Sequence, residues 1–265
     1  SSISTQADLN NSGMLAAAAN NSVAATGANS RINNTASGTL EAGLLADGSL
    51  GTAGDLSVSA TLGMNGAGQH VSAGDQHISA KTLDLSGSRN SGKNLSYTAS
   101  QGDLNLAHAT VNASSSLSAQ STQVLNFDAA QITAGQLALA AHDLSNVAGS
   151  LMQTGSGDTR IDLAGSLNNT QGTIAVNSNN FSVTAATLIN TAANGQQGKI
   201  QHTGTGTLAL HANQVLGSGG LIQTNNVLDM QADSATLDGG TSVAKQVNIN
   251  SATLSNRGGS VQQTG

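Results

Sequence analysis

The sequence repeats a short pattern about every 20 residues. Each copy has two apolar residues separated by one residue and followed by small residues, as in Leu56–Ala60 and Leu95–Ala99. The second apolar residue of each copy marks positions 58, 78, 97, 117, 139, 163, 183, 210, 230 and 249. Most successive markers lie 19 to 22 residues apart. Such a spacing is typical of a chain that stacks one small structural unit many times.

A second motif follows the first within each repeat. It reads apolar, any residue, Asn, a short gap, Gly, any residue, apolar, and its copies are Leu9–Leu15, Ile32–Leu40, Leu144–Leu151, Leu167–Ile174 and Leu254–Val261. Alternating apolar and small polar residues predict half-buried strands of ~3–5 residues. Asn and Gly tolerate the left-handed backbone of tight turns. We therefore expect two or three short strands in each repeat.

A single 20-residue repeat cannot bury its own apolar side chains. A second copy stacked at ~4.8 Å completes the backbone hydrogen bonds and covers the apolar row. We predict an all-β fold, a right-handed parallel β-helix (β-solenoid) with about 20 residues per rung. Residues 1–265 should form a single β-helix shaft fragment of a larger protein, least regular at 41–53 and with a loop insertion near 191–200.

Composition separates this stacked fold from disorder. Aromatic residues make up 1% of the chain and charged residues 8%, with 32 Gly and no Pro. Disordered segments are usually rich in Pro or charge, and this chain is neither. The lack of Pro also suits a backbone whose N–H groups are almost all in ladders. The composition favours the stacked repeat.

Some side chains should occupy fixed places in the stack. Asn34, Asn146, Asn169 and Asn256 recur at one phase of the repeat, so we expect partial amide ladders at the turns. Tyr97 and Phe181 fall at inward phases and should fill wide places in the core rather than bind a ligand.

The charge and residue content argue against several classes of protein. The net charge is −6, and the eight Lys and Arg are scattered, so we expect no nucleic-acid partner. No apolar run approaches the ~20 residues of a transmembrane helix. The chain has no Cys and therefore no disulfide or thiolate metal site. It starts at Ser1 without a signal-peptide pattern, which suggests a piece of a longer protein.

Two groups of residues have the residue types of ligand sites. Gly87–Asn94 nearly matches a phosphate-binding loop, but Asn94 replaces the Ser or Thr that would hold magnesium, so we interpret it as a turn with an exposed Lys. The chain has six His, of which His142 and His211 could stack several rungs apart. We expect all six to be solvated on turns or outer strands, and we predict no metal or cofactor site. The six are His70, His77, His108, His142, His202 and His211.

Two further patterns contain residue types that occur in functional surfaces. Asp75, Asp84 and Asp103 lie one or two rungs apart and could form a facing carboxylate pair, as a polysaccharide-cleaving β-helix needs. We interpret them as isolated surface charges and predict no catalytic site. Thr recurs beside an inward Leu and could form an ice-binding row, but its spacing drifts, which favours plain strand formers. These residues are Thr61, Thr82, Thr187, Thr236 and Thr253.

The rung pattern resembles the haemagglutinin repeats of large bacterial exoproteins. The copies that carry this resemblance best are LSNVAGSLMQTG at Leu144–Gly155 and LNNTQGTIAV at Leu167–Val176. The proteins concerned are filamentous haemagglutinins and contact-dependent growth inhibition effectors. The resemblance runs from about Leu9 to the end of the chain. It implies a right-handed β-helix, export through an outer-membrane two-partner-secretion transporter, and a place on or outside the cell.

Three functions follow as hypotheses. The first is a structural shaft of an adhesin or inhibition effector, which extends a distal binding or toxin module from the cell surface and is not an enzyme. The second is a binding module whose side face contacts a host glycan or a bacterial receptor. The third is a polysaccharide-cleaving enzyme, which would need a groove with convergent acids.

Overall fold

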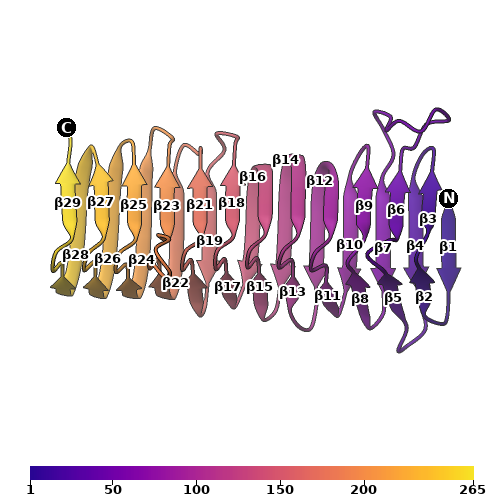
Figure 1. Ribbon diagram of the computed structural model, residues 1–265, viewed down its shortest axis with the longest axis horizontal. Helices are drawn as coiled ribbons and strands as arrows, with labels where there is room; N and C mark the ends of the chain where they lie inside the picture. Colours follow the sequence, from indigo (N-terminus) through magenta and orange to yellow (C-terminus); the bar gives the residue numbers. More distant parts are fainter. The chain divides into compact units, whose positions relative to one another are not determined.

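The computed structural model describes residues 1–265, and all of its regular elements are β-strands. The chain divides into two compact units. Unit 1 comprises residues 1–126 and 132–135, and unit 2 comprises residues 127–131 and 136–265. Parallel strands coil into a β-solenoid of about 12 turns, which confirms the predicted fold class (Figure 1). The structure contains no helix with the length and apolarity needed to cross a membrane.

Unit 1 is built from short strands that pair in parallel with the strands of the next turn. Its strands are β1 (Ser2–Thr5), β2 (Leu9–Asn11), β3 (Met14–Ala17), β4 (Asn21–Ala25), β5 (Arg31–Asn34), β6 (Thr39–Ala42), β7 (Leu56–Ala60), β8 (Gly63–Gly66), β9 (Gln69–Ser72), β10 (Gln76–Ala80), β11 (Thr82–Asp84), β12 (Arg89–Ala99), β13 (Leu104–Asn105), β14 (Thr110–Ser121) and β15 (Val124–Asn126).

Unit 2 has the same organisation, and β16 (Gln131–Ala141) contributes residues to both units. Its other strands are β17 (Asp143–Ser145), β18 (Ser150–Gln153), β19 (Thr159–Leu163), β20 (Ser166–Asn168), β21 (Thr173–Val176), β22 (Phe181–Ile189), β23 (Lys199–His202), β24 (Thr207–Leu216), β25 (Leu221–Thr224), β26 (Val227–Thr236), β27 (Thr241–Ala244), β28 (Gln246–Ser255) and β29 (Ser260–Gln263).

Each turn has three strand segments, which we call first, second and third. The turn of β7, β8 and β9 shows them separately, whereas β12 and β14 run without a break from a third segment into the next first segment. In β22, β24, β26 and β28, a first segment instead runs on into the second. Each repeat therefore contains three strand segments, which confirms the expectation of two or three.

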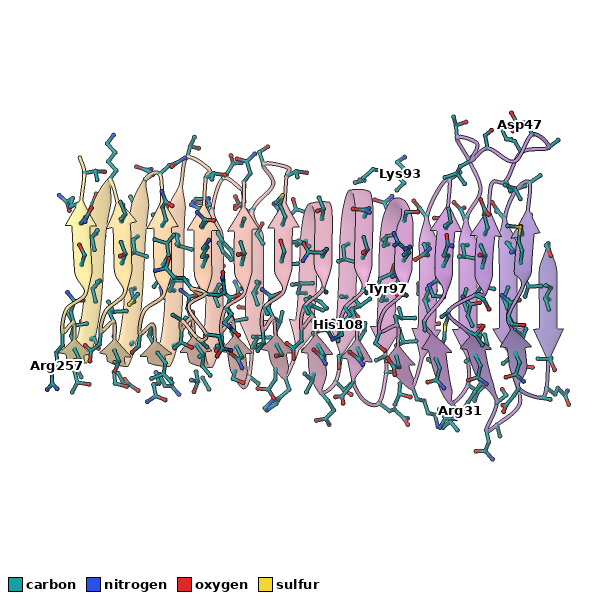
Figure 2. The ribbon with its side chains drawn as sticks, in the orientation of Figure 1. Arg31, Asp47, Lys93, Tyr97, His108 and Arg257 are labelled. Carbon is teal, nitrogen blue, oxygen red and sulfur yellow. The ribbon has the colours of Figure 1, made fainter.

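The core of each unit is a set of apolar columns, because equivalent residues of successive turns lie side by side. In unit 1, Val58, Ile78 and Tyr97 are consecutive partners in the first segment, and all are fully buried. In unit 2, Ile200 and Ile222 are partners in the third segment. Tyr97 and Phe181 are 0% exposed, which confirms their predicted inward positions. Figure 2 marks the place of Tyr97 in the solenoid.

The hydrogen-bond register corrects two of the sequence markers. Tyr97 pairs with Ala119 rather than with Leu117. Leu139 pairs with Ile161 rather than with Leu163. In both copies, two inward residues lie two positions apart on one face, so alternation alone could not distinguish them. Successive turns are spaced by about 21 residues, close to the predicted length of about 20.

Two loops depart from the regular turn, and both lie at corners between segments. The loop of residues 43–54 lies between β6 and β7 and projects beyond the strand ends (Figure 1). Residues 190–198 connect β22 to β23 and contain a short hairpin in which Ala193 bridges Gln196. The sequence analysis expects the least regular stretch at 41–53 and a loop insertion near 191–200, and these two loops overlap those ranges.

From the turn of β11 onward, the corner between the second and third segments carries a left-handed residue in every turn except the one that holds the loop of residues 190–198. In unit 1 these include Gly87 and His108, with φ of 70° and 58°. In unit 2 the column contains Ala129, Ala148, Gln171, Gly219, Gly239 and Gly258, with φ between 53° and 67°. Backbone hydrogen bonds to the next turn hold the position, as from Ala148 N to Thr170 O. Only Gly adopts this conformation without strain, so the Ala residues cost stability.

The same corner contains the predicted amide ladders. In unit 2, Asn146 donates to Asn169, which donates to Asn190, both at 2.8 Å. The Oδ1 atom of Asn146 has no partner, because Phe127 occupies the equivalent position one turn earlier. The prediction was wrong for Asn256, which is exposed and follows Leu237 rather than another amide.

In unit 1 the ladder includes a histidine. Asn11 donates to Asn34 at 2.8 Å, and Asn34 contacts Nε2 of His70 at 3.1 Å. The other ring nitrogen of His70 contacts Oδ1 of Asn90 at 2.9 Å. The turn of His70 has Gly66 where an Asn would stand, and a Cβ there would lie 3.0 Å from the imidazole. The ring thus replaces the missing amide.

The left-handed column gives a prediction for Ala148. Ala148→Gly should raise the free energy of unfolding by about 0.5–1 kcal/mol, because φ is 53° and the side chain is exposed. Chemical unfolding followed by circular dichroism measures this. Ala175→Gly, in the ordinary strand backbone of β21, is the control and should lower stability by a similar amount. A loss of stability in Ala148→Gly would contradict the left-handed backbone conformation of residue 148.

His70 should make unit 1 sensitive to acid. Burial lowers the pKa of its imidazole from 6.5 to about 4, so the unfolded chain binds the proton more readily. The contribution of His70 to stability is complete above pH 6.5, and about 3 kcal/mol is lost as pH falls towards 4. His70→Gln should show a shallower fall in unfolding free energy between these pH values. Equal slopes for both proteins would refute the burial of a neutral imidazole.

Candidate functional site

The aspartates considered as a catalytic pair are hydrogen-bonded within the solenoid. Asp84 accepts from the Ser86 N–H and from the Asn105 side chain of the next turn, at 3.1 and 3.0 Å. Asp103 accepts from the backbone of the next turn, and Asp75 from the side chain of Asn94. The three carboxylates occupy three different positions in the turn. The structure does not bring them together as a facing pair.

The same use of carboxylates recurs along the chain. An aspartate near a corner accepts the backbone N–H of the equivalent place on the following turn. This arrangement is found at Asp8, Asp55, Asp103, Asp128, Asp143, Asp158 and Asp238. The sequence showed these residues only as sparse charges. Their common role became visible once the register was known.

The hydrogen bonds also set the ionisation of two of these groups. The backbone N–H of Arg257, followed by the Ser255 hydroxyl, lowers the pKa of the Asp238 carboxyl. The backbone N–H of Ser166 has the largest effect on Asp143, and it lowers that pKa although partial burial opposes it. Both carboxyls are therefore stabilised as anions, the form that accepts hydrogen bonds and the opposite of what a general acid needs.

Gly87–Asn94 is not a phosphate-binding loop. Only its first residues form a turn, and Arg89–Asn94 belongs to β12, with a bulge between Gly92 and Asn94. The N–H groups of Gly87, Arg89 and Lys93 already bind carbonyl groups of neighbouring turns. No N–H cradle is left for an anion. Lys93 is exposed as predicted, but at a bulge in a strand rather than in a turn (Figure 2).

The histidines do not converge, and the prediction of solvated histidines is wrong for two of them. His70 and His202 are 0% and 1% exposed rather than solvated. His202 fills the inside of a corner, where its ring contacts Thr224 Oγ1 and Ser178 O at 3.0 and 2.9 Å. His142 and His211 are not stacked, because the partner of His211 in the preceding turn is Thr184. No group of three or more acidic or His side chains could hold a metal ion.

The recurring Thr residues form no continuous row. Thr187 and Thr253 occupy the same column, but Gln214 and Ser234 separate them. Thr236 belongs to a different column, between Leu216 and Ser255. The interpretation of plain strand formers fits this arrangement.

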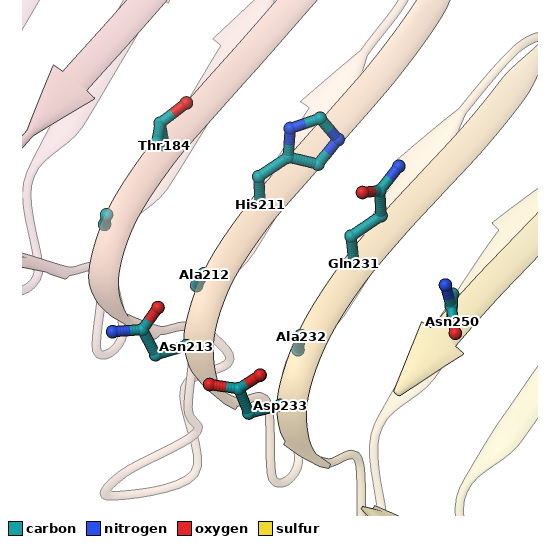
Figure 3. A pocket seen from close by; sticks show the side chains of 9 residues that line it. Thr184, His211, Ala212, Asn213, Gln231, Ala232, Asp233 and Asn250 are labelled. Atoms are coloured by element: carbon teal, nitrogen blue, oxygen red, sulfur yellow. The ribbon is translucent and has the colours of Figure 1, made fainter. Parts of the chain in front are cut away.

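A polar groove lies in unit 2, at the corner between the first and second segments (Figure 3). Its volume is about 360 Å³. One wall is a register-matched column from four turns, Thr184, His211, Gln231 and Asn250. Asn213 and Asp233 line the opposite side, and Ala212 and Ala232 form the floor. Ala185, the register partner of Ala212, continues this floor into the preceding turn.

Small residues create this hollow, since Ala leaves space between longer side chains. The equivalent corner of unit 1 has a smaller depression lined by Ala60, Ala80 and Lys81. In the unit 2 groove, Nε2 of His211 lies 3.6 Å from Asp229 Oδ2 and makes no hydrogen bond. The small residues after each apolar pair were visible in the sequence, but the register was needed to place them side by side.

Comparisons with known proteins agree with the sequence resemblance. No family model and no solved structure matches the chain. The curated protein named Toxin CdiA, from Yersinia pestis, is 33% identical over 250 residues. The match covers 83% of this chain but only 8% of that protein. The sequence relationship and the β-solenoid together confirm the resemblance to the contact-dependent growth inhibition and filamentous haemagglutinin exoproteins, and the chain is homologous to a short segment of Toxin CdiA.

Proposed function

We propose that the chain is a structural shaft segment of a large secreted adhesin or contact-dependent inhibition effector. In this role residues 1–265 act as one rod that extends a distal binding or toxin module from the bacterial cell surface. The homology to a segment of Toxin CdiA and the solenoid fold support this proposal. An outer-membrane two-partner-secretion transporter would export it, and a receptor on a host or neighbouring bacterium would contact the whole protein.

The main observation in support of the proposal is that polar side chains form hydrogen bonds between successive turns. Aspartates accept backbone N–H groups of the next turn, and asparagines bind asparagines of the next turn. Such bonds add stiffness along the stack and leave few side chains to act on a substrate. Each turn depends on its neighbours, which is the energetics of a repeat protein.

The same bonds argue against an enzyme. A glycan-cleaving site needs two carboxyl groups at a defined separation in a groove. In the groove of unit 2, Asp233 is the only carboxylate among the lining residues. We propose that the segment has no catalytic, cofactor or metal site and no nucleic-acid partner.

The polar groove favours side-face binding as a second function. Its walls offer hydroxyl, amide, imidazole and carboxylate groups from successive turns. The exposed apolar residues do not add to it, because they lie elsewhere, at Met14, Leu45, Leu50, Met152, Leu254 and Val261. Loss of receptor binding in a whole protein carrying His211→Ala and Gln231→Ala, with secretion unchanged, would favour this function over a passive shaft.

A passive shaft should tolerate the removal of whole turns. Thr207, Val227 and Gln246 are equivalent positions, so deletion of residues 207–245 joins Gly206 to Gln246 in phase. Apolar residues then stack on apolar residues, with Val183 against Ile249. We expect unchanged β-type circular dichroism and a maximum dimension shorter by about 10 Å in small-angle X-ray scattering.

Deletion of residues 207–235 is the matched control. It removes fewer residues but joins Gly206 to Thr236, which places a second segment where a first segment should follow. This variant should lose cooperative unfolding. If both deletions disrupted the fold equally, or if the in-phase variant kept its original length, the shaft proposal would be rejected.

A further inference from the structure

The chain contains two Asn-Gly pairs in very different surroundings. Asn194-Gly195 is exposed at the tip of the hairpin in residues 190–198, and Asn65-Gly66 lies at the end of strand β8. An Asn followed by Gly can lose its amide by intramolecular attack when the backbone can bend, because Gly has no side chain to hinder ring closure. The two pairs therefore allow a comparison within one molecule.

At the hairpin tip nothing holds the reacting groups. Asn194 and Gly195 have φ of 48° and 77°, the left-handed pair of a two-residue hairpin turn. The flanking bonds join Ala193 and Gln196, so the N–H of Gly195 has no carbonyl partner. The side chain of Asn194 makes no hydrogen bond, and a Cβ on Gly195 would meet no atom within 4 Å. The turn has room to rearrange.

The second pair, Asn65-Gly66, is fixed by its neighbours in the sheet. Asn65 pairs with Asn33 on one turn and with Asp84 on the next, and its amide donates to Asn33 Oδ1 at 3.0 Å. Gly66 is buried, and a Cβ there would lie 2.8 Å from both Leu85 and Met64. Ring closure at Asn65 would require two ladders to open. Strands inside such a sheet open far less often than loop tips.

We propose that Asn194 is a site of spontaneous deamidation through a cyclic imide formed with Gly195. The Gly195 nitrogen loses its proton to hydroxide and attacks Cγ of Asn194, the Cγ–Nδ2 bond breaks, and ammonia leaves. Water then adds to either imide carbonyl. Cleavage of the new Cγ–N bond gives aspartate, and cleavage of the original backbone bond gives isoaspartate. The sum is Asn plus water giving a carboxylate plus ammonium, since the ammonia takes up the proton that the new carboxyl group releases, with no oxidant and no cofactor.

The other protruding loop has a related pair that should be less reactive. Asp47-Gly48 lies in residues 43–54, but the Asp47 carboxylate accepts from the Ser49 hydroxyl and N–H, at 2.6 and 3.0 Å. These bonds lower the pKa of the Asp47 carboxyl and keep it ionised. An ionised carboxylate resists attack by the neighbouring nitrogen, and its hydrogen bonds would have to break first.

The modification would change the loop without touching the stack. Isoaspartate adds one carbon to the main chain, which a two-residue turn between Ala193 and Gln196 cannot accommodate with the same pairing. The strands on either side pair with neighbouring turns, through β22 with β24 and β23 with β25. Each event adds one negative charge to an exposed corner of unit 2. The surface of the protein thus changes with age while its fold does not.

The test is incubation of the folded chain at mildly alkaline pH, followed by proteolytic peptide mapping with mass spectrometry. We expect the peptide containing Asn194 to show the mass increase of NH₂ replaced by OH, in both aspartate and isoaspartate forms. The rate at Asn194 should exceed that at Asn65 by about a hundredfold or more, since opening paired strands costs several kcal/mol and each 1.4 kcal/mol is tenfold.

Incubation in denaturing urea supplies the control. Both Asn-Gly pairs should then react at similar rates, because neither is held by structure. Asn194→Gln should abolish the fast phase in the folded chain and leave circular dichroism unchanged. Equal rates at Asn194 and Asn65 in the folded chain, or no reaction at Asn194 when Asn65 reacts in urea, would overturn the proposal.

Discussion

Stacking of one turn on the next is the constraint on which the structure depends. A turn of about 21 residues has three short segments, none of which can bury its inward side chains alone. Val58 and Ile78 are fully buried because each is covered by its equivalent on a neighbouring turn. The parallel register also brings identical side chains together, so an Asn can bind an Asn and a left-handed corner can repeat. Local irregularity is tolerated only where this register is preserved.

Much of the fold could be predicted from the sequence because the pattern itself repeats. The inward position of Tyr97 and the ladder of Asn146 and Asn169 followed from phase alone. The register of Ala119 and Ile161 did not, since two residues on one face look equivalent in an alternating pattern. The burial of His70 also escaped prediction, because it depends on the absence of a side chain at Gly66, on a different strand of the same turn.

The candidate site was harder to predict than the fold for a related reason. The groove of unit 2 is made of residues such as Ala212 and Gln231, which carry no chemical signature one at a time. The groove forms because the three Ala residues of its floor and the four polar side chains of one wall occupy equivalent positions in successive turns. Conversely, Asp84 and Asp103 looked like candidates for chemistry only until their hydrogen-bond partners were known. In a repeat protein, a surface site is formed by side chains at the same position of successive turns. These side chains lie about 21 residues apart in the sequence, so the sequence does not show them as neighbours.

The two protruding loops show how such a chain can vary without losing its fold. Residues 43–54 separate β6 from β7, yet β7 still pairs with β4 across the loop. Residues 190–198 separate β22 from β23, yet β23 still pairs with β21. The loop-closure entropy of a few extra residues grows only slowly with length, whereas one lost register would uncover every inward side chain of a turn. Corners are therefore where a solenoid can gain new surface at low cost, and strands are where it cannot.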